Sequence, residues 1–312
     1  MARNRRPCAG GKKRGSVALI TDMSQGRPAA ILWRFTIPML LSAVFQQLYN
    51  VADSVVAGRF VGEDALAAVG ASFPITMIFM AVALGSNTGC SVIISQLFGA
   101  KETARMKTAV STSVIAILAL SALLTAGGFL FCEPLMRLLN TPESVFDEAM
   151  RYAAVVCGGV GVTILYNMCA SFMRSLGNGR MPLVFLTISC VLNIALDTLF
   201  VVVLHIGVVG TALATLIAQC ISALLSMAYI ARAFKPFLPR KMDFRAPAGL
   251  WTQMAASGLS MGLMNSVYAL GSLTMQRAIN TLGETVMAAH TSARRILSLT
   301  GAPMSNLGTA GA

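Results

Sequence analysis

Apolar stretches of about 20 residues recur along the chain roughly every 30 to 40 residues, and each is long enough to cross a bilayer. They dominate the composition, since 56% of the residues are hydrophobic, 12% are charged and the mean hydropathy is +0.72. Ordinary soluble domains do not have such values. Inside a bilayer every backbone polar group must be paired, which excludes open sheets. The sequence therefore predicts an all-α, polytopic membrane helical bundle.

The hydropathy pattern predicts seven complete membrane helices and part of an eighth. The expected spans cover residues 31–57, 68–96, 107–132, 150–173, 182–204, 208–231, 248–279 and 285 onward. Between the third and fourth spans, CEPLMRLLNTPESVFDEAM has a T-P-E-S helix start signal and apolar residues at i, i+3 and i+4. This stretch predicts a short interfacial helix.

Basic residues alternate between successive loops, as the positive-inside rule requires if these spans are correct. One set of loops, beginning with the N-terminal tail, holds 18 Lys and Arg residues, and the other holds 4. The richer set predicts the cytoplasmic side, so we expect a multi-pass protein of the cytoplasmic membrane with its N-terminus inside. Because the net charge of +12 is concentrated at helix ends, it indicates membrane topology and no nucleic-acid partner.

The tail itself carries six positive charges in its first 20 residues and has no apolar core with a cleavage site, so it is not a cleavable signal peptide. Met23 opens a stretch typical of a natural start, which leaves open whether residues 1–22 are translated. The seven cysteines are scattered and lie mostly inside apolar runs, which favours packing thiols. Neither histidine has a metal-ligand neighbour at i+3 or i+4. We expect no cofactor and no zinc site.

A short internal repeat relates the two ends of the chain. LWRFTIPMLLS at 32–42 aligns with LWTQMAASGLS at 250–260, and GEDALAAVGAS at 62–72 aligns with GETVMAAHTSA at 283–293. A repeated six-helix unit would stop after the second helix of its second copy, so we expect a truncated chain lacking about four helices. The predicted domains are a basic cytoplasmic tail (1–30), an N-lobe of six helices (31–231), a cytoplasmic linker (232–247) and a partial C-lobe (248–312).

Two acids fall well inside apolar spans, Asp53 near the end of the first helix and Asp197 in the fifth. An Asp at a helix centre costs about 2.5 to 3.5 kcal/mol to insert, so each is expected to face a cavity, a partner or an ion. Asn193 lies four residues before Asp197, which places both on one helical face. Their oxygens could hold a proton or begin a Na⁺ shell. A structural hydrogen bond at a helix contact is the alternative.

Two further residues have both a functional and an ordinary interpretation. Pro38 weakens the first helix locally and provides a place to bend, although many membrane-helix prolines have no dynamic role. Thr215, on a helix rich in glycine and alanine, is a possible further oxygen ligand, although such a hydroxyl more often bonds to its own helix.

The chain resembles the MATE family of multidrug and toxic compound extrusion transporters, in particular its DinF-like branch. The resemblance covers residues 24–312. It rests on RFTIPMLLSAVFQQLYNVADSVVAGRFVGEDALAAVG, SQLFGAKE, MRSLGNGRMPL, VLNIALDTLF, GVVGTALATLIAQ and HTSARRI, in that order along the chain.

The resemblance implies an antiporter of two six-helix lobes within the MOP superfamily, which exports bulky cationic or amphipathic small molecules against inward H⁺ or Na⁺. It implies a cation site in the N-lobe formed by Asp53, Asn193, Asp197 and Thr215, and a bending proline at Pro38. It also implies a substrate cavity lined by Asn167, Gln46 and Gln47. The seventh span has no acid, which favours coupling in the N-lobe.

Three alternatives stay open at this point. A lipid-linked oligosaccharide flippase of the same superfamily would need several basic residues in its cavity, and no basic residue is centred in spans one to six. An intramembrane enzyme would need a signature such as H-E-x-x-H, which is absent, so we expect no enzymatic activity. The third alternative is a fragment that does not transport. The only other partners expected are membrane lipids.

Overall fold

The computed structural model describes residues 28–61, 63–138, 143–239 and 248–280, together with the single helical residues 293, 297, 301, 304 and 308. In these ranges all regular structure is helical. The long helices are α1 (Pro28–Val56), α2 (Glu63–Gly99), α3 (Thr103–Leu138), α4 (Glu143–Ser175), α5 (Arg180–Asp197), α6 (Val208–Ala233) and α7 (Ala248–Asn280). Two π-helical segments follow α1 and α5, at Ala57–Val61 and Thr198–Val203, and a 3₁₀ turn spans Lys235–Phe237.

The seven complete spans expected from hydropathy each correspond to one of these helices. Within the described residues, five helical stretches are long and apolar enough to cross a membrane: Phe79–Gly99, Thr103–Arg137, Phe146–Ser175, Arg180–Val203 and Val208–Ala233. The α1 and α7 helices are of similar length but are not in that set. The eighth span lies outside the described residues except for the five single positions.

The short interfacial helix expected between the third and fourth spans is not a separate element. The α3 helix continues through Pro134 to Leu138, and α4 already begins at Glu143. The apolar residues at i, i+3 and i+4 therefore lie in the last turns of α3 and the first turns of α4. Met136 and Ala149 are both fully buried, in one small apolar cluster. This packing across the α3–α4 junction is why the two helices extend so far.

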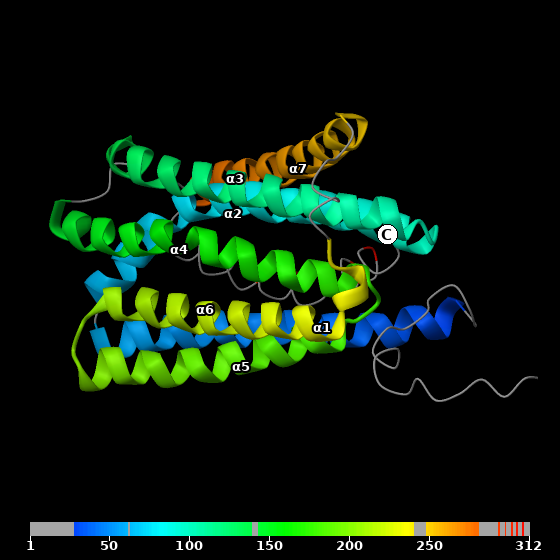
Figure 1. Ribbon diagram of the computed structural model, residues 1–312. Coiled ribbons are helices and arrows are strands. Elements are labelled where there is room, and N and C mark those ends of the chain that lie inside the picture. Colours follow the sequence, from blue (N-terminus) through cyan, green and yellow to red (C-terminus); the bar gives the residue numbers. More distant parts are fainter. Residues whose placement is uncertain are drawn as a thin grey trace, which may run out of the picture.

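The helices lie roughly side by side (Figure 1). Helices that are consecutive in the sequence are not always adjacent in space. The α1 helix packs beside α5, α5 beside α6, α6 beside α4, and α4 beside α2. The α3 helix packs on both α2 and α4. The connection between α5 and α6 lies at the left in Figure 1, and the connection between α4 and α5 lies at the right. The left end is called the Asp53 end below, and the right end the Arg174 end.

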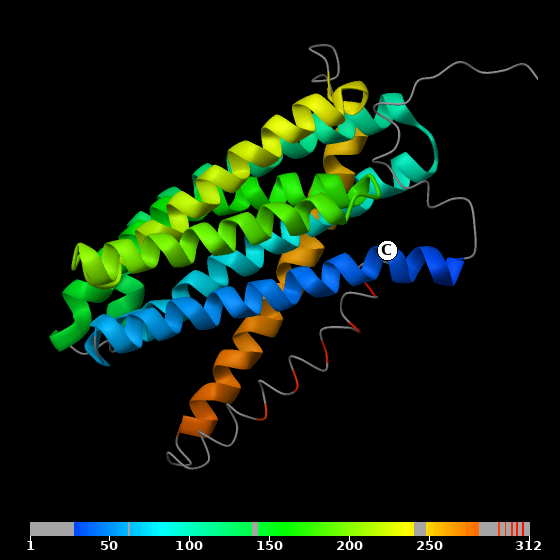
Figure 2. The same ribbon diagram turned by 90° about the horizontal axis from the view of Figure 1, so that it is seen from below.

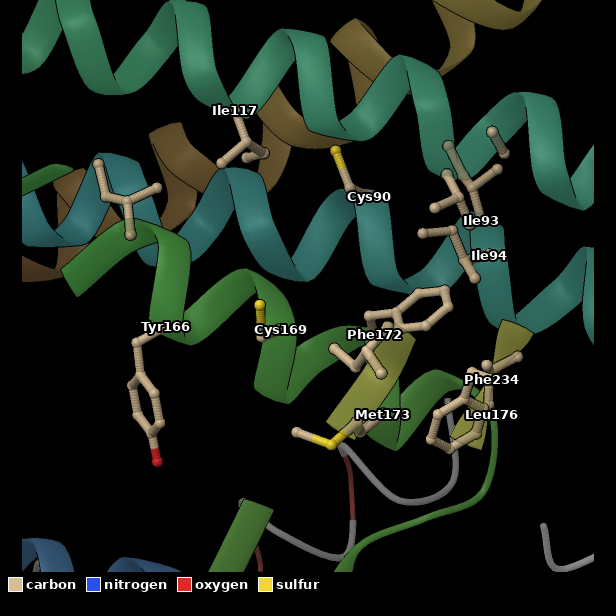
Figure 3. Close-up of a cluster of buried hydrophobic side chains, with 14 of the residues drawn as sticks. Cys90, Ile93, Ile94, Ile117, Tyr166, Cys169, Phe172, Met173, Leu176 and Phe234 are labelled. Atoms are coloured by element: carbon tan, nitrogen blue, oxygen red, sulfur yellow. The ribbon is translucent and has the colours of Figure 1, made fainter. Parts of the chain in front are cut away.

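The main hydrophobic core lies where α2, α3, α4 and the end of α6 meet (Figure 3). It includes Met106, Ile164 and Phe234, each at most 1% exposed. In contrast, Leu123, Leu130 and Val191 are more than 60% exposed on the outer faces. Large apolar side chains outside and buried Asn and Ser side chains inside are the pattern expected when the solvent is lipid. The chain is a multi-pass membrane protein.

The α7 helix crosses α2 steeply, and its far end diverges from the rest of the bundle (Figure 2). Backbone meets backbone at this crossing. A Cβ added to Gly85 would lie 2.4 Å from Gly262 Cα, and one added to Gly89 would lie 2.6 Å from Gly258 N. The Ser257 hydroxyl also donates to the Gly89 carbonyl at 3.2 Å. This is the close small-residue packing that membrane helices use in place of a hydrophobic driving force.

Candidate functional site

The residues predicted to form a cation site come from three helices that pack side by side. Asp53 lies in the last turn of α1, Asn193 and Asp197 lie at the end of α5, and Thr215 lies two turns into α6. Since α5 packs between α1 and α6, the four side chains meet at the Asp53 end of the bundle. A π-helical segment follows each acid, and these two segments contact each other. Such wide turns are frequent at functional sites.

Asn193 is at the centre of this group. With its amide nitrogen facing the acids, it donates to Asp53 Oδ1 at 2.8 Å and to Asp197 Oδ2 at 3.2 Å. Its amide oxygen then accepts from the Thr215 hydroxyl at 3.3 Å. This orientation satisfies every polar atom of the amide, because ionised carboxylates can only accept hydrogen bonds. Asn193 and Asp197 are both 0% exposed.

The two carboxyl groups lie within hydrogen-bonding reach of each other. The ion pairs of the described residues are Arg105–Glu102 and Arg137–Glu133, both at exposed helix ends, and neither involves Asp53 or Asp197. Two acids this close repel each other unless a proton or a cation lies between them. Asp197 Oδ1 is buried without a hydrogen-bond partner among the described residues. A proton shared by the two carboxyl groups would relieve this repulsion.

The side chains of this group offer oxygen ligands. Carboxylate, amide and hydroxyl oxygens are the ligands that hard cations prefer. No cluster of three or more His, Cys, Asp or Glu side chains that could hold a metal occurs in the part of the chain that is described. Two carboxyl groups and two neutral oxygens could hold a proton or a hard metal cation. The expected H⁺ or Na⁺ stays a prediction.

Two tyrosines near this group were not identified from the sequence. Tyr49 lies one turn before Asp53 and is 6% exposed, with its hydroxyl beside Thr215 and Asp53. Tyr152, on α4, lies close to both acids. The i−4 spacing from Asp53 was a signal for Tyr49. No local signal identifies Tyr152, because only the packing of α4 brings it near.

The predicted substrate residues lie on α1 and α4, between the Asp53 end and the Arg174 end. Gln46 and Asn167 line a cavity of about 220 Å³ between α1, α4 and α5. Asn167 donates to the Thr163 carbonyl at 2.8 Å within its own helix. Gln47 does not line this cavity, since it is exposed on α1, where it accepts from the Asn50 amide at 3.4 Å. The role of all three in substrate binding stays a prediction.

Pro38 is buried inside α1, which continues as a helix on both sides of it. The Ser42 hydroxyl donates to the Pro38 carbonyl at 2.8 Å. The proline removes one backbone donor, so α1 has a weakened turn about four turns before Asp53. Whether α1 bends there stays a prediction.

Comparison with known proteins identifies the family of this chain. The MatE family model matches residues 38–199, more than half of the chain. The chain belongs to the MatE family. The matched region contains Asp53, Asn193 and Asp197, and Thr215 lies beyond it.

Relatives of this MatE-family chain are named as transporters or resistance proteins. The probable multidrug resistance protein YpnP of Bacillus subtilis (strain 168) is 29% identical over 290 residues, which cover 93% of this chain and 64% of YpnP. An FAD transporter of Shewanella oneidensis is 23% identical, and the match covers 86% of this chain and 60% of that transporter. The chain thus spans less than two thirds of these relatives.

Solved structures give the same architecture. An outward-facing multidrug resistance MATE family transporter of the MOP superfamily superposes with a TM-score of 0.84 at 28% identity. The match covers 91% of this chain and 63% of that transporter. The predicted MATE-like, all-helical fold class is therefore confirmed.

Proposed function

We propose that this chain supplies the cation-coupled lobe of an exporter for bulky cationic or amphipathic compounds in the cytoplasmic membrane, with its N-terminus inside. The observation that carries the proposal is the Asp53–Asn193–Asp197 group. It is buried among membrane helices and lacks a basic partner in the described part of the chain. Burying two acids in this way is costly, so a mobile positive charge is the simplest compensation.

The coupling step follows from the packing. H⁺ or Na⁺ binding at Asp53 and Asp197 neutralises their repulsion and draws α1 and α5 together around Asn193. The α1 helix also forms one wall of the cavity that Gln46 and Asn167 line. A movement of α1 about its weakened turn at Pro38 would therefore change the shape of that cavity. The cation would then favour one conformation of α1, and the exported compound would favour the other.

The rival functions are less well supported. A flippase for pyrophosphate-linked lipids needs several basic residues around its cavity, and Arg174 is the one basic residue among the described residues that line this cavity. No observation favours an enzyme, and the relatives named above are transporters or resistance proteins. Transport by this MatE-family chain is therefore the function proposed.

The test is efflux of a fluorescent cationic dye from a drug-sensitive bacterial host that expresses the chain. Asp53→Asn and Asp197→Asn should each abolish dye export while the amount of protein in the membrane is unchanged. Asp147→Asn, which changes an exposed acid in the first turns of α4, is the matched control and should export normally. Normal export by both site variants would refute the proposal, as would no export by the unmodified chain.

A further inference from the structure

The cavity between α1, α4 and α5 has a charged group that the cation site does not use. It lies toward the Arg174 end, because it is lined by the middle of α1, the last turns of α4 and the start of α5. Gln46, on its wall, precedes Asp53 by seven residues, or about 10 Å along α1. The cavity is therefore adjacent to the acidic group but distinct from it.

Among the described residues that line this cavity, Arg174 is the only one with a charged side chain. Its guanidinium donates to the Ser171 hydroxyl at 3.3 Å, within the same helix. No carboxylate pairs with it among the described residues, whose two ion pairs lie elsewhere. An arginine has five N–H donors, so most of its hydrogen-bonding capacity is unused. A partly buried cation without an anion is costly to keep.

The surroundings of Arg174 argue against a side chain that simply extends to the water interface. The residues directly after α4, Leu176 to Gly179, are buried. A Cβ added to Gly179 would lie 3.3 Å from the Phe35 ring, so α1 covers this connection closely. Arg180, six residues further on, is exposed. Arg180 is thus exposed, whereas Arg174 is partly buried at the wall of a cavity.

The rest of the lining is suited to an amphipathic molecule. Gln46 and the Tyr166 and Asn167 side chains add polar groups, and Met39 and Leu186 add apolar surface. In Figure 3 the Tyr166 ring points away from the neighbouring core side chains, with its hydroxyl outermost. A volume of about 220 Å³ is below that of a pocket for a whole drug-sized molecule, which is about 300 to 1,000 Å³. The cavity would hold one end of a larger ligand.

We infer that the Arg174 end of this cavity binds the anionic group, a carboxylate or a phosphate, of an amphipathic ligand. The planar guanidinium can bind either group through two parallel hydrogen bonds. The neutral lining adds no competing negative charge. This inference rests on the proposed function in treating the cavity as the substrate cavity, and it extends the substrate class from cations to compounds that carry an anionic group.

The experiment is a binding measurement, which needs no transport. The full chain is placed in phosphatidylcholine nanodiscs and titrated with three aromatic probes: naphthyl phosphate, naphthol and naphthylmethyl-trimethylammonium. We expect naphthyl phosphate to bind the unmodified chain most tightly. Arg174→Gln should weaken its binding at least about tenfold, the effect of losing one charge-assisted hydrogen bond. Binding of the cationic probe should not weaken.

Two further variants make the result specific. Arg174→Lys keeps the charge but loses the planar pair of donors, so it should retain part of the preference for naphthyl phosphate. Arg180→Gln removes an exposed arginine nearby and should change nothing, which controls for the net charge of +12. Equal affinity of the unmodified chain for all three probes overturns the inference without any variant. Equal binding of naphthyl phosphate by the unmodified chain and a folded Arg174→Gln variant also overturns it.

The anion could belong to an exported compound or to a lipid headgroup. Repeating the titration in nanodiscs that contain phosphatidylglycerol separates the two sources. Loss of naphthyl phosphate binding there supports an anion site occupied by lipid, and unchanged binding supports one reserved for a transported compound. Dye export tests the acid variants Asp53→Asn and Asp197→Asn, whereas this binding tests the Arg174 variants. A failure of cation coupling and a failure of the anion site would thus be seen in different measurements.

Discussion

The side-chain amide of Asn193 on α5 lies 2.8 Å from the Asp53 carboxylate on α1. The same amide lies 3.2 Å from Asp197, one turn further along α5. One neutral side chain therefore holds both acids.

Replacing the bridging amide should weaken cation binding while both acids remain. In Asn193→Ala the carboxyl oxygens lose their donor, and we expect a loss of about 1 to 3 kcal/mol in unfolding free energy. Stabilisation by NaCl relative to choline chloride, or by lower pH, should also fall, because the acids are no longer held together. The measurement is the thermal unfolding midpoint in detergent. Thr198→Ala, which removes an exposed hydroxyl bonded to the Ile194 carbonyl, is the control. An unaltered response to both Na⁺ and pH would contradict the assignment of Asn193.

Removing the helix-one proline should separate cation binding from export. Pro38→Ala restores a backbone hydrogen bond in α1 and stiffens the turn, so we expect export to fall about tenfold or more. Cation-dependent thermal stabilisation should persist, since Asp53 lies about four turns away. Pro134→Ala, which changes an exposed proline inside α3, is the matched control and should leave dye efflux unchanged. Full export by Pro38→Ala would show that α1 does not need this turn.

The α2–α7 crossing should not tolerate a side chain on α2. In Gly89→Ala the new Cβ would meet the Gly258 backbone at 2.6 Å, so the helices must separate. We expect a cost of about 1 to 3 kcal/mol, typical of overpacking. Gly99→Ala, on the same helix but in open space, should have almost no effect. Chemical unfolding of the two variants in detergent compares them directly, and equal stability would exclude a tight crossing.

The turn that leads into α6 should require glycine. Gly207 has φ +75° and ψ −155°, a combination that is almost restricted to glycine. Gly207→Ala should cost about 1 to 3 kcal/mol and displace the start of α6, which carries Thr215. Gly249→Ala, in open space at the start of α7, is the control. Matching unfolding midpoints for the two variants would rule out strain at this turn.

The sequence predicted the parts of this structure that depend on local spacing. Apolar run lengths located seven helices, and the i, i+4 spacing placed Asn193 and Asp197 on one face of α5. The cost of a buried acid also singled out Asp53. That these acids meet across α1 and α5 was an implication of the family resemblance, because no local pattern shows which helices are neighbours.

The features that the sequence did not predict depend on tertiary packing. The π-helical segments after Asp53 and Asp197 arise where α1, α5 and α6 adjust to one another. Tyr152 reaches the acids because α4 packs against α6. The separate interfacial helix was wrong for a related reason, since periodicity alone does not distinguish a short surface helix from the extended end of a longer one.

The crossing of α2 and α7 has a mechanical consequence. Where side chains interlock, tilting one helix over another forces rotamer changes and opens voids. At Gly85, Gly89, Gly258 and Gly262 the touching residues carry no side chains, so a tilt there meets mainly small groups such as Ser86 and Ser257, whose hydroxyl bonds to the Gly89 carbonyl. The segment that begins the predicted second repeat is thus joined to the first by a close backbone contact. At such a contact one helix can change its angle to the other without separating from it.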